Sequence, residues 1–220
     1  MKIRISLFVV LSLLCSVLYA QKPSFGVHAI SNFSFLELTE GNVVFDKRSD
    51  VKFGYGAGAR LSFPLGEKFN IVTELNWIRK GGQYEFSFTD DNGIFLRTMK
   101  PKMNLDYLSV PLLMTISFGN KIIISPQIGS SVNFLIHQNY DYEVEVDGVV
   151  FYLPTYNDMD NFNRFDQTVL VGVDFSLAIS EKMSAYLTMR GDIGFMEVEK
   201  DELILVGKNR SLVFLAGVRF

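Results

Sequence analysis

The clearest pattern in the chain is an alternation of apolar and polar positions with a period of two. It is longest between Val169 and Ser180, where every odd-numbered position is apolar and most even-numbered positions are small or polar. A helical repeat would scatter both sets around the axis, whereas a β-strand places each set on its own face. The segment is therefore predicted to be a strand whose two faces meet different surroundings.

The same alternation recurs along the chain and predicts eight strands. They cover approximately residues 24–35, 51–64, 67–80, 103–118, 121–138, 166–180, 182–196 and 210–220. The connections alternate between short ones at 64–67, 119–120 and 180–182 and long ones at 36–50, 81–102, 139–165 and 197–209. An even strand number, with short turns at the periplasmic rim and long loops outside, is typical of up-and-down outer-membrane barrels.

The distribution of polar residues favours a membrane barrel over a soluble one. A soluble barrel would bury the six large apolar side chains of 169–179 and expose mainly Gly, Ser and Ala. The opposite assignment gives the expected fold class: all-β, an eight-stranded antiparallel up-and-down transmembrane barrel with a polar, side-chain-filled interior. A barrel of this size has room for side chains and little else. Six charged residues on the inward faces are predicted to pair there: Arg60, Glu74, Asp174, Arg190, Asp192 and Arg219.

The first 20 residues are predicted to be a cleaved signal peptide that exports the protein to the outer membrane. Lys2 and Arg4 form the basic start, an apolar stretch follows, and Ala20 precedes the cleavage point. The apolar run is shorter than the ~20 residues that an uncleaved anchor helix needs. Residues 21–220 are then one barrel domain. The only cysteine, Cys15, lies within the signal, so the mature chain has no disulfide.

Composition agrees with a lipid-exposed surface. Aromatic residues make up 14% of the chain, including 20 Phe, while charged residues make up 20%, below the roughly 25% of soluble domains. Without Lys2 and Arg4, 19 of the 21 basic residues remain against 24 acidic ones, a net charge of −5. This charge argues against nucleic acid as a partner. The outer surface of the barrel is expected to contact outer-membrane lipid.

The last predicted strand ends the chain on an aromatic residue. Leu212, Phe214, Ala216, Val218 and Phe220 share its apolar face. A terminal aromatic preceded by alternating apolar residues is the usual recognition signal for the barrel-assembly machinery. Phe214, Val218 and Phe220 are therefore predicted to form this signal, with the machinery as a partner.

Several stretches resemble the PorT-type outer-membrane β-barrel family. The run from Leu105 to Leu113 is similar to the family's L-x-Y-L-x-I-P-L-L strand, and Ile128-Gly129 to its P-x-x-G strand. Residues 171–174 and 216–220 are similar to its later glycine-containing strands. The resemblance spans about residues 22–220. It implies an eight-stranded barrel in the outer membrane; the family's named member takes part in type IX secretion.

The sequence contains little that indicates catalysis. His28 and His137 are both predicted to face inward, so a barrel enzyme acting on lipid or peptide at the membrane rim is one alternative. We expect instead that they fill the lumen through hydrogen bonds. The sequence has no nucleophile motif, metal-ligand spacing or phosphate-binding loop. No enzyme activity and no cofactor are predicted; a small-solute channel is the other alternative.

The segment 139–165 is the most distinctive predicted connection. It is rich in acidic and tyrosine residues and has one basic residue, Arg164. Such a surface suits calcium, a basic protein or a glycan. The simpler interpretation is a solvated hairpin in which 142–146 pair with 149–153 across Asp147-Gly148, a type I′ turn signal. The expected function is a structural or partner-binding one, with an envelope protein bound through loops 81–102 and 139–165. A secretion or assembly complex is the setting that this function suggests.

Overall fold

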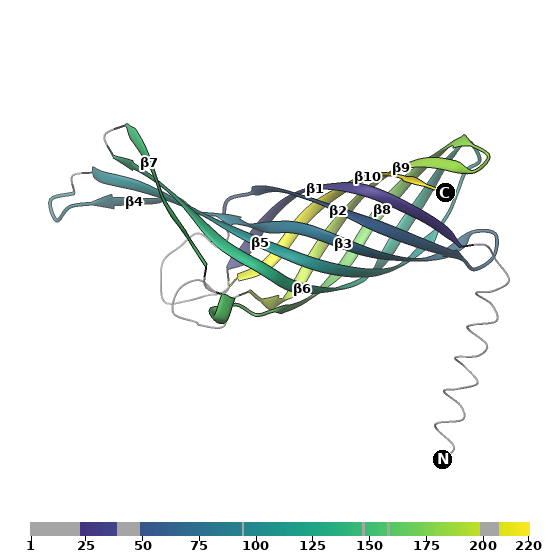
Figure 1. The fold of residues 1–220 in the computed structure, drawn as a ribbon, viewed down its shortest axis with the longest axis horizontal. Coiled ribbons are helices and arrows are strands. Elements are labelled where there is room, and N and C mark those ends of the chain that lie inside the picture. The colour runs from purple at the N-terminus through teal and green to yellow at the C-terminus, as the bar shows by residue number, and fades with distance from the viewer. Residues whose placement is uncertain (1–22, 39–48, 94, 147, 158, 199–206) are drawn as a thin grey trace, which may run out of the picture.

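The computed structural model describes residues 23–38, 49–93, 95–146, 148–157, 159–198 and 207–220 (Figure 1). The predicted signal peptide lies outside these residues. Within the described ranges the chain forms strands and one short 3-10 helix, η1 (Met159–Asn161), and no helix is long and apolar enough to cross a membrane. The strands are β1 (Ser24–Leu38), β2 (Lys52–Pro64), β3 (Phe69–Gln83), β4 (Phe86–Thr89), β5 (Phe95–Ile116), β6 (Ile122–Val146), β7 (Val149–Tyr156), β8 (Phe165–Ser180), β9 (Met183–Glu197) and β10 (Gly207–Arg219).

Eight of these strands close into a barrel. Every pairing is antiparallel, in the order β1, β2, β3, β5, β6, β8, β9 and β10. The last strand returns to the first, with Gly26 opposite Arg219 and Leu38 opposite Gly207, so no edge remains in the ring. Figure 1 shows these strands inclined around a common axis. The predicted eight-stranded antiparallel barrel is confirmed.

Apart from a register shift in β6, the side chains of the barrel strands alternate between the inner and outer faces as predicted. On β8 the Val171 side chain is exposed on the outer surface while Asp174 is buried inside. β1 shows the same contrast between exposed Phe25 and buried His28. A continuous outer layer of exposed aliphatic and aromatic side chains results, and the interior holds the charged groups.

One inward assignment was wrong. His137 is exposed, because a β-bulge in β6 shifts the alternation just before it. Asp106 pairs with His137 but Tyr107 pairs with Leu135, which leaves Ile136 as an extra residue. An inserted residue turns the following side chains to the other face. Gln138, the next residue, is buried in place of His137.

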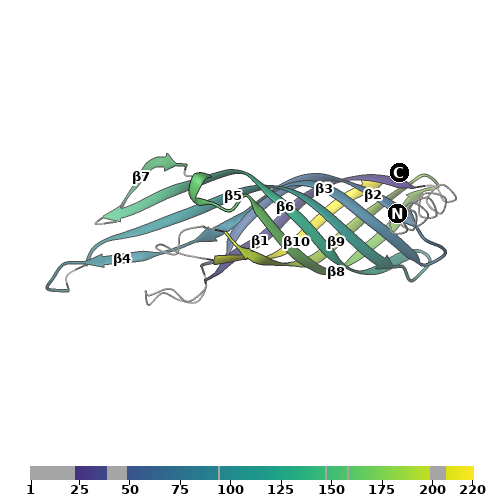
Figure 2. The same ribbon diagram turned by 90° about the horizontal axis from the view of Figure 1, so that it is seen from below.

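Two strands continue far beyond the barrel. β5 has 22 residues and β6 has 25, and their outer halves pair with each other from Asp106 to Thr98. β4 pairs along the free side of β5 and β7 along the free side of β6, so a four-stranded antiparallel blade projects from one end (Figures 1 and 2). We call β4, β7 and the outer halves of β5 and β6 the blade.

The blade changes the interpretation of two predicted loops. Most of 81–102 and 139–165 is strand rather than irregular connection. The predicted hairpin is confirmed in register, since Tyr142 pairs with Leu153 and Val146 with Val149. Gly148 in its turn has a φ of 76°, a left-handed conformation that glycine adopts without strain.

The sequence predicted a polar interior, but one part of the interior is apolar. Its end below the blade holds a buried apolar cluster that includes Met103, Leu105, Tyr107, Phe162 and Leu215. Phe162 directly follows η1 and is 2% exposed. The cluster forms because several inward positions near this end are apolar, among them Val213 and Leu215 of β10. The polar groups therefore occupy the remainder of the lumen.

Candidate functional site

The centre of the lumen is an ion-pair cluster built on neighbouring strands. Arg60 of β2 lies opposite Glu74 of β3 in the register, and both point inward. Arg60 Nε and Nη2 donate to Glu74 Oε1 at 3.0 and 2.8 Å, and Nη1 donates to Asp174 Oδ1 at 2.8 Å. Arg190 Nη1 reaches Glu74 Oε2 at 2.9 Å. The Glu74 side chain, 0% exposed, thus bridges two guanidinium groups.

Lys80 extends the cluster toward the blade and was missed in the sequence. Its Nζ lies 2.9 Å from Asp192 Oδ2, and Asp192 Oδ1 lies 3.5 Å from Arg190 Nε. The signal was present, because Lys80 shares even numbering with the inward Glu74 of the same strand. The cluster then holds three cations and three carboxylates. Such a balance is required where charges are removed from water.

A hydrogen-bonded histidine borders the cluster. The His28 ring nitrogens lie 2.8 Å from Tyr186 Oη and from Asn76 Oδ1. Asn76 Nδ2 donates to Glu74 Oε2 at 2.9 Å, which links His28 to the ion pairs. The Arg60 guanidinium lies 4.4 Å from the centre of the Tyr186 ring. His28 therefore fills the lumen through hydrogen bonds, as expected.

Two substitutions of Tyr186 separate its hydrogen bond from its ring. Tyr186→Phe removes the bond to His28 and keeps the ring under Arg60, so we expect a loss of about 1 kcal/mol in the free energy of unfolding. Tyr186→Leu also removes the cation–π contact, and we expect roughly a further 1–2 kcal/mol. Urea unfolding of the refolded barrel measures both. Equal losses in the two variants would show that the ring contact contributes nothing.

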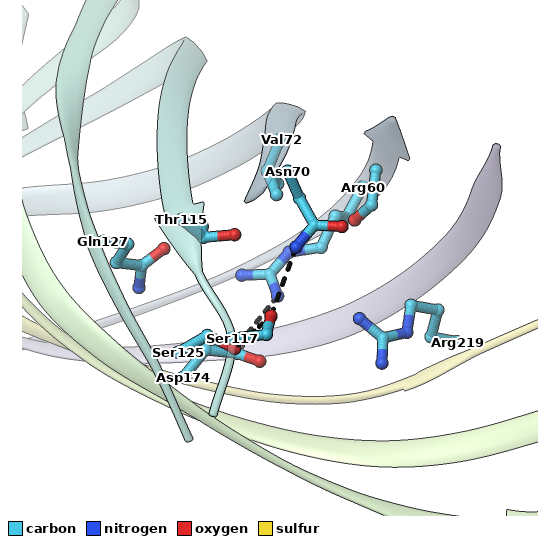
Figure 3. A pocket seen from close by; sticks show the side chains of 10 residues that line it. Arg60, Asn70, Val72, Thr115, Ser117, Ser125, Gln127, Asp174 and Arg219 are labelled. Atoms are coloured by element: carbon cyan, nitrogen blue, oxygen red, sulfur yellow. Dashed lines mark hydrogen bonds and ion pairs between the residues drawn. The ribbon is translucent and has the colours of Figure 1, made fainter. Parts of the chain in front are cut away.

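Arg219 does not join the ion pairs, contrary to the prediction. Its Nε donates to Ser184 Oγ at 3.2 Å and its Nη2 to Ser176 Oγ at 3.5 Å, close to the short-turn end of the barrel. The face was predicted correctly, but Arg219, the final residue of β10, contacts serine hydroxyls instead of a carboxylate. Figure 3 shows it across a hollow from Arg60.

The blade carries a ladder of opposite charges on one face. Lys102 Nζ lies 3.2 Å from Glu143, and Lys100 Nζ lies 3.8 Å from Glu145. Asp141 accepts hydrogen bonds from the Asn104 side chain at 2.7 Å. The acidic positions of β6 are thus paired with basic or amide groups of β5. This pairing leaves little free charge for a cation or a basic partner.

The outer edge of the blade is apolar. β7 is the last strand on its side of the sheet, and Val149, Val150, Phe151, Tyr152 and Leu153 are all exposed, with Tyr152 78% exposed. Soluble surfaces rarely expose five consecutive large apolar residues. An exposed edge strand with such residues favours pairing with another strand.

The predicted assembly signal lies on the outer surface. Phe220 is exposed, and its backbone pairs with Phe25 of β1 at the barrel seam. Phe214 packs edge-to-face on Phe33, with ring centres 6.4 Å apart. Val218 lies opposite Val27 on the same face. The role of Phe214, Val218 and Phe220 in assembly stays a prediction.

The two histidines singled out in the sequence lie apart in the described structure. His28 is enclosed in the lumen and His137 is exposed on β6, so the two do not share a site. No three His, Cys, Asp or Glu side chains converge as metal ligands among the residues that the structure describes.

Comparisons with known proteins give one family. The family model described as outer membrane protein beta-barrel domain matches residues 19–198. No curated protein matches the chain. Similar solved structures include a major outer membrane protein from Thermus thermophilus, with 11% identity, a TM-score of 0.48, and coverage of 91% of this chain and 100% of that one. Neisserial surface protein A has 15% identity, a TM-score of 0.43, and coverage of 90% and 98%.

Proposed function

The chain belongs to the family of outer membrane protein β-barrel domains, and on this premise we propose that it is a non-enzymatic barrel that presents its blade to a protein partner. The barrel lies in the outer membrane, with the short turns toward the periplasm and the blade outside. The partner is another envelope or surface protein. Binding through the segments 81–102 and 139–165 follows, because these segments form most of the blade.

The exposed apolar edge of β7 carries this proposal. A barrel needs no strands beyond the bilayer, yet β5 and β6 continue and support two further strands. The edge offers main-chain N–H and C=O groups together with apolar side chains on both faces of the strand. These are the two features that strand addition uses, since main-chain hydrogen bonds supply affinity and alternate side chains supply specificity.

The interior supports this choice over the two alternatives. A small-solute channel needs a continuous water path, whereas the lumen is crossed by the ion-pair cluster and by the apolar cluster beside it. An enzyme at the rim needs an accessible base and nucleophile, whereas His28 is enclosed and hydrogen-bonded on both ring nitrogens. A structural or binding role requires neither.

The finer assignment to the PorT-type barrels stays a prediction. It rests on the similarity of Leu105–Leu113, a stretch that here runs from the base of the blade into the barrel wall. Membership of a secretion or assembly complex would suit a barrel with an external docking strand. Assembly itself would require the barrel-assembly machinery and the terminal Phe220.

Cross-linking from single cysteines tests the proposal. With Cys15 replaced by Ser, the chain has no cysteine, so Tyr152→Cys on β7 can carry a photoactivatable cross-linker in intact cells. We expect a discrete protein adduct from this position. The Val150→Lys substitution in the same strand should suppress the adduct, because a charge on an edge strand opposes further pairing.

Phe195→Cys provides the matched control, since Phe195 is exposed on β9 away from the blade. It should give no adduct of the same mass. Equal yields from residues 152 and 195, or an adduct that persists with Val150→Lys, would overturn the proposal. Heat-modifiable migration of each variant confirms that its barrel has formed.

A further inference from the structure

The short-turn end of the lumen, which faces the periplasm in the proposed orientation, contains a small hollow of about 20 Å³ that is partly open to solvent (Figure 3). Residues of β2, β3, β5, β6, β8 and β10 line it. Arg60 and Asp174 are among the lining residues, so the hollow borders the ion-pair cluster.

The charges around the hollow do not balance. Asp174 Oδ1 accepts from Arg60 and from the Thr188 hydroxyl, and Arg60 is also paired with Glu74. Arg219 is different: its hydrogen bonds go to the neutral hydroxyls of Ser184 and Ser176. Figure 3 shows its guanidinium pointing into the hollow. The lining thus has two cations and one carboxylate, an excess of one positive charge.

Two buried polar groups in the lining have no partner within the described structure. Gln127 Nε2 and Ser62 Oγ make no hydrogen bond, although each residue is only 4% exposed. An amide N–H without an acceptor is costly in such a place. Nearby, Asn70 Nδ2 donates to Ser117 Oγ, which shares a hydrogen bond with Ser125. The hollow therefore gathers donors that lack an acceptor beside an unmatched cation.

We propose that this hollow binds a carboxylate from the periplasm. Arg219 would supply the charge, and Gln127 and Ser62 would donate to the oxygens after small side-chain rotations. The positive excess of one matches a single carboxylate, and the partly open hollow lets its oxygens reach the lining donors while the rest of the ligand stays in solvent. The carboxylate has two possible sources, a small organic acid or the chain end of a polypeptide. The site is independent of the blade.

Titration of the full mature chain in detergent micelles tests the proposal. Arginine Nε–H resonances are followed by NMR with ¹⁵N-labelled arginine, and the Arg219 signal is assigned by its absence in Arg219→Lys. Sodium acetate is added at constant ionic strength against sodium chloride. We expect a saturable shift of the Arg219 signal with half-saturation in the millimolar range, and roughly tenfold weaker binding in Gln127→Leu.

Arg210 is the control within the same molecule. It lies at the opposite end of β10, paired with Glu37 at 2.5 Å, and its signal should not move. A shift of Arg219 that does not saturate, or that equals the shift of Arg210, overturns the proposal. Ser62→Ala serves as a second weakening variant if Gln127→Leu fails to fold.

Peptide probes distinguish the two sources. Trialanine with a free C-terminus is compared with its C-terminal amide and with acetate. Saturable binding of acetate and trialanine, or of either one alone, supports the carboxylate site and indicates which source fits. Binding of the amide as tight as that of the free peptide would show that the carboxylate is not the recognised group and would overturn the proposal.

Discussion

We expect Glu74→Leu to lower the free energy of unfolding by about 3–5 kcal/mol, the largest effect of any lumen substitution considered. Leucine removes the carboxylate that both Arg60 and Arg190 contact, so excess positive charge stays in a site that water does not reach. Equilibrium urea unfolding in lipid vesicles measures the loss. The same change on the blade, Glu145→Leu, should cost about 0–1 kcal/mol, because Glu145 and its partner Lys100 are only half-buried and 3.8 Å apart.

A double variant identifies the source of the loss. Glu74→Leu with Arg190→Leu leaves Arg60 and Lys80 facing Asp174 and Asp192, so the charges balance again. The double variant should therefore lose less than the sum of the single variants. Strict additivity, or a loss below about 1 kcal/mol for Glu74→Leu alone, would contradict a structural role for the cluster.

Val171→Arg should cost about 2–4 kcal/mol in a bilayer, because a charge near the middle of the membrane must leave water. Ile179→Arg should cost only about 0–1 kcal/mol near the interface. The comparison is well matched, since both residues lie on the outer face of β8 and are 53% and 54% exposed. Unfolding in vesicles measures both values. Equal, small losses would mean that this face contacts water and would contradict the membrane assignment.

Which side chains face outward and which face inward followed from the sequence, because lipid favours apolar side chains and the lumen favours polar ones. Val171 and Asp174 fall on different faces by counting alone, and the structure agrees. The hairpin joining β6 and β7 was also predictable, since Asp147-Gly148 is a strong turn signal between two alternating segments. The local sequence pattern is enough to predict such features, because residues adjacent in the chain determine them.

Three errors share a different cause. The bulge at Ile136 moves His137 to the other face, and nothing in the local alternation reveals an inserted residue. The segment 81–102 was predicted as a loop, whereas its Lys100 and Lys102 lie on β5 beside Glu145 and Glu143 of β6. Arg219 was assigned to the correct face but was expected to pair with a carboxylate, whereas it contacts serine hydroxyls. Each depends on strand register, which side chains distant in sequence determine.

The sequence by itself determined the strands, their inner and outer faces, the barrel class and the chemistry available in the lumen, because a period of two is imposed by the backbone and by the bilayer. Only the tertiary structure decided which charges meet. Glu74 contacts Arg190 across 116 positions of the chain, Lys80 finds Asp192, and Arg219 is left facing a hollow. Barrel closure and register fix these distances, and neither is encoded in any single strand.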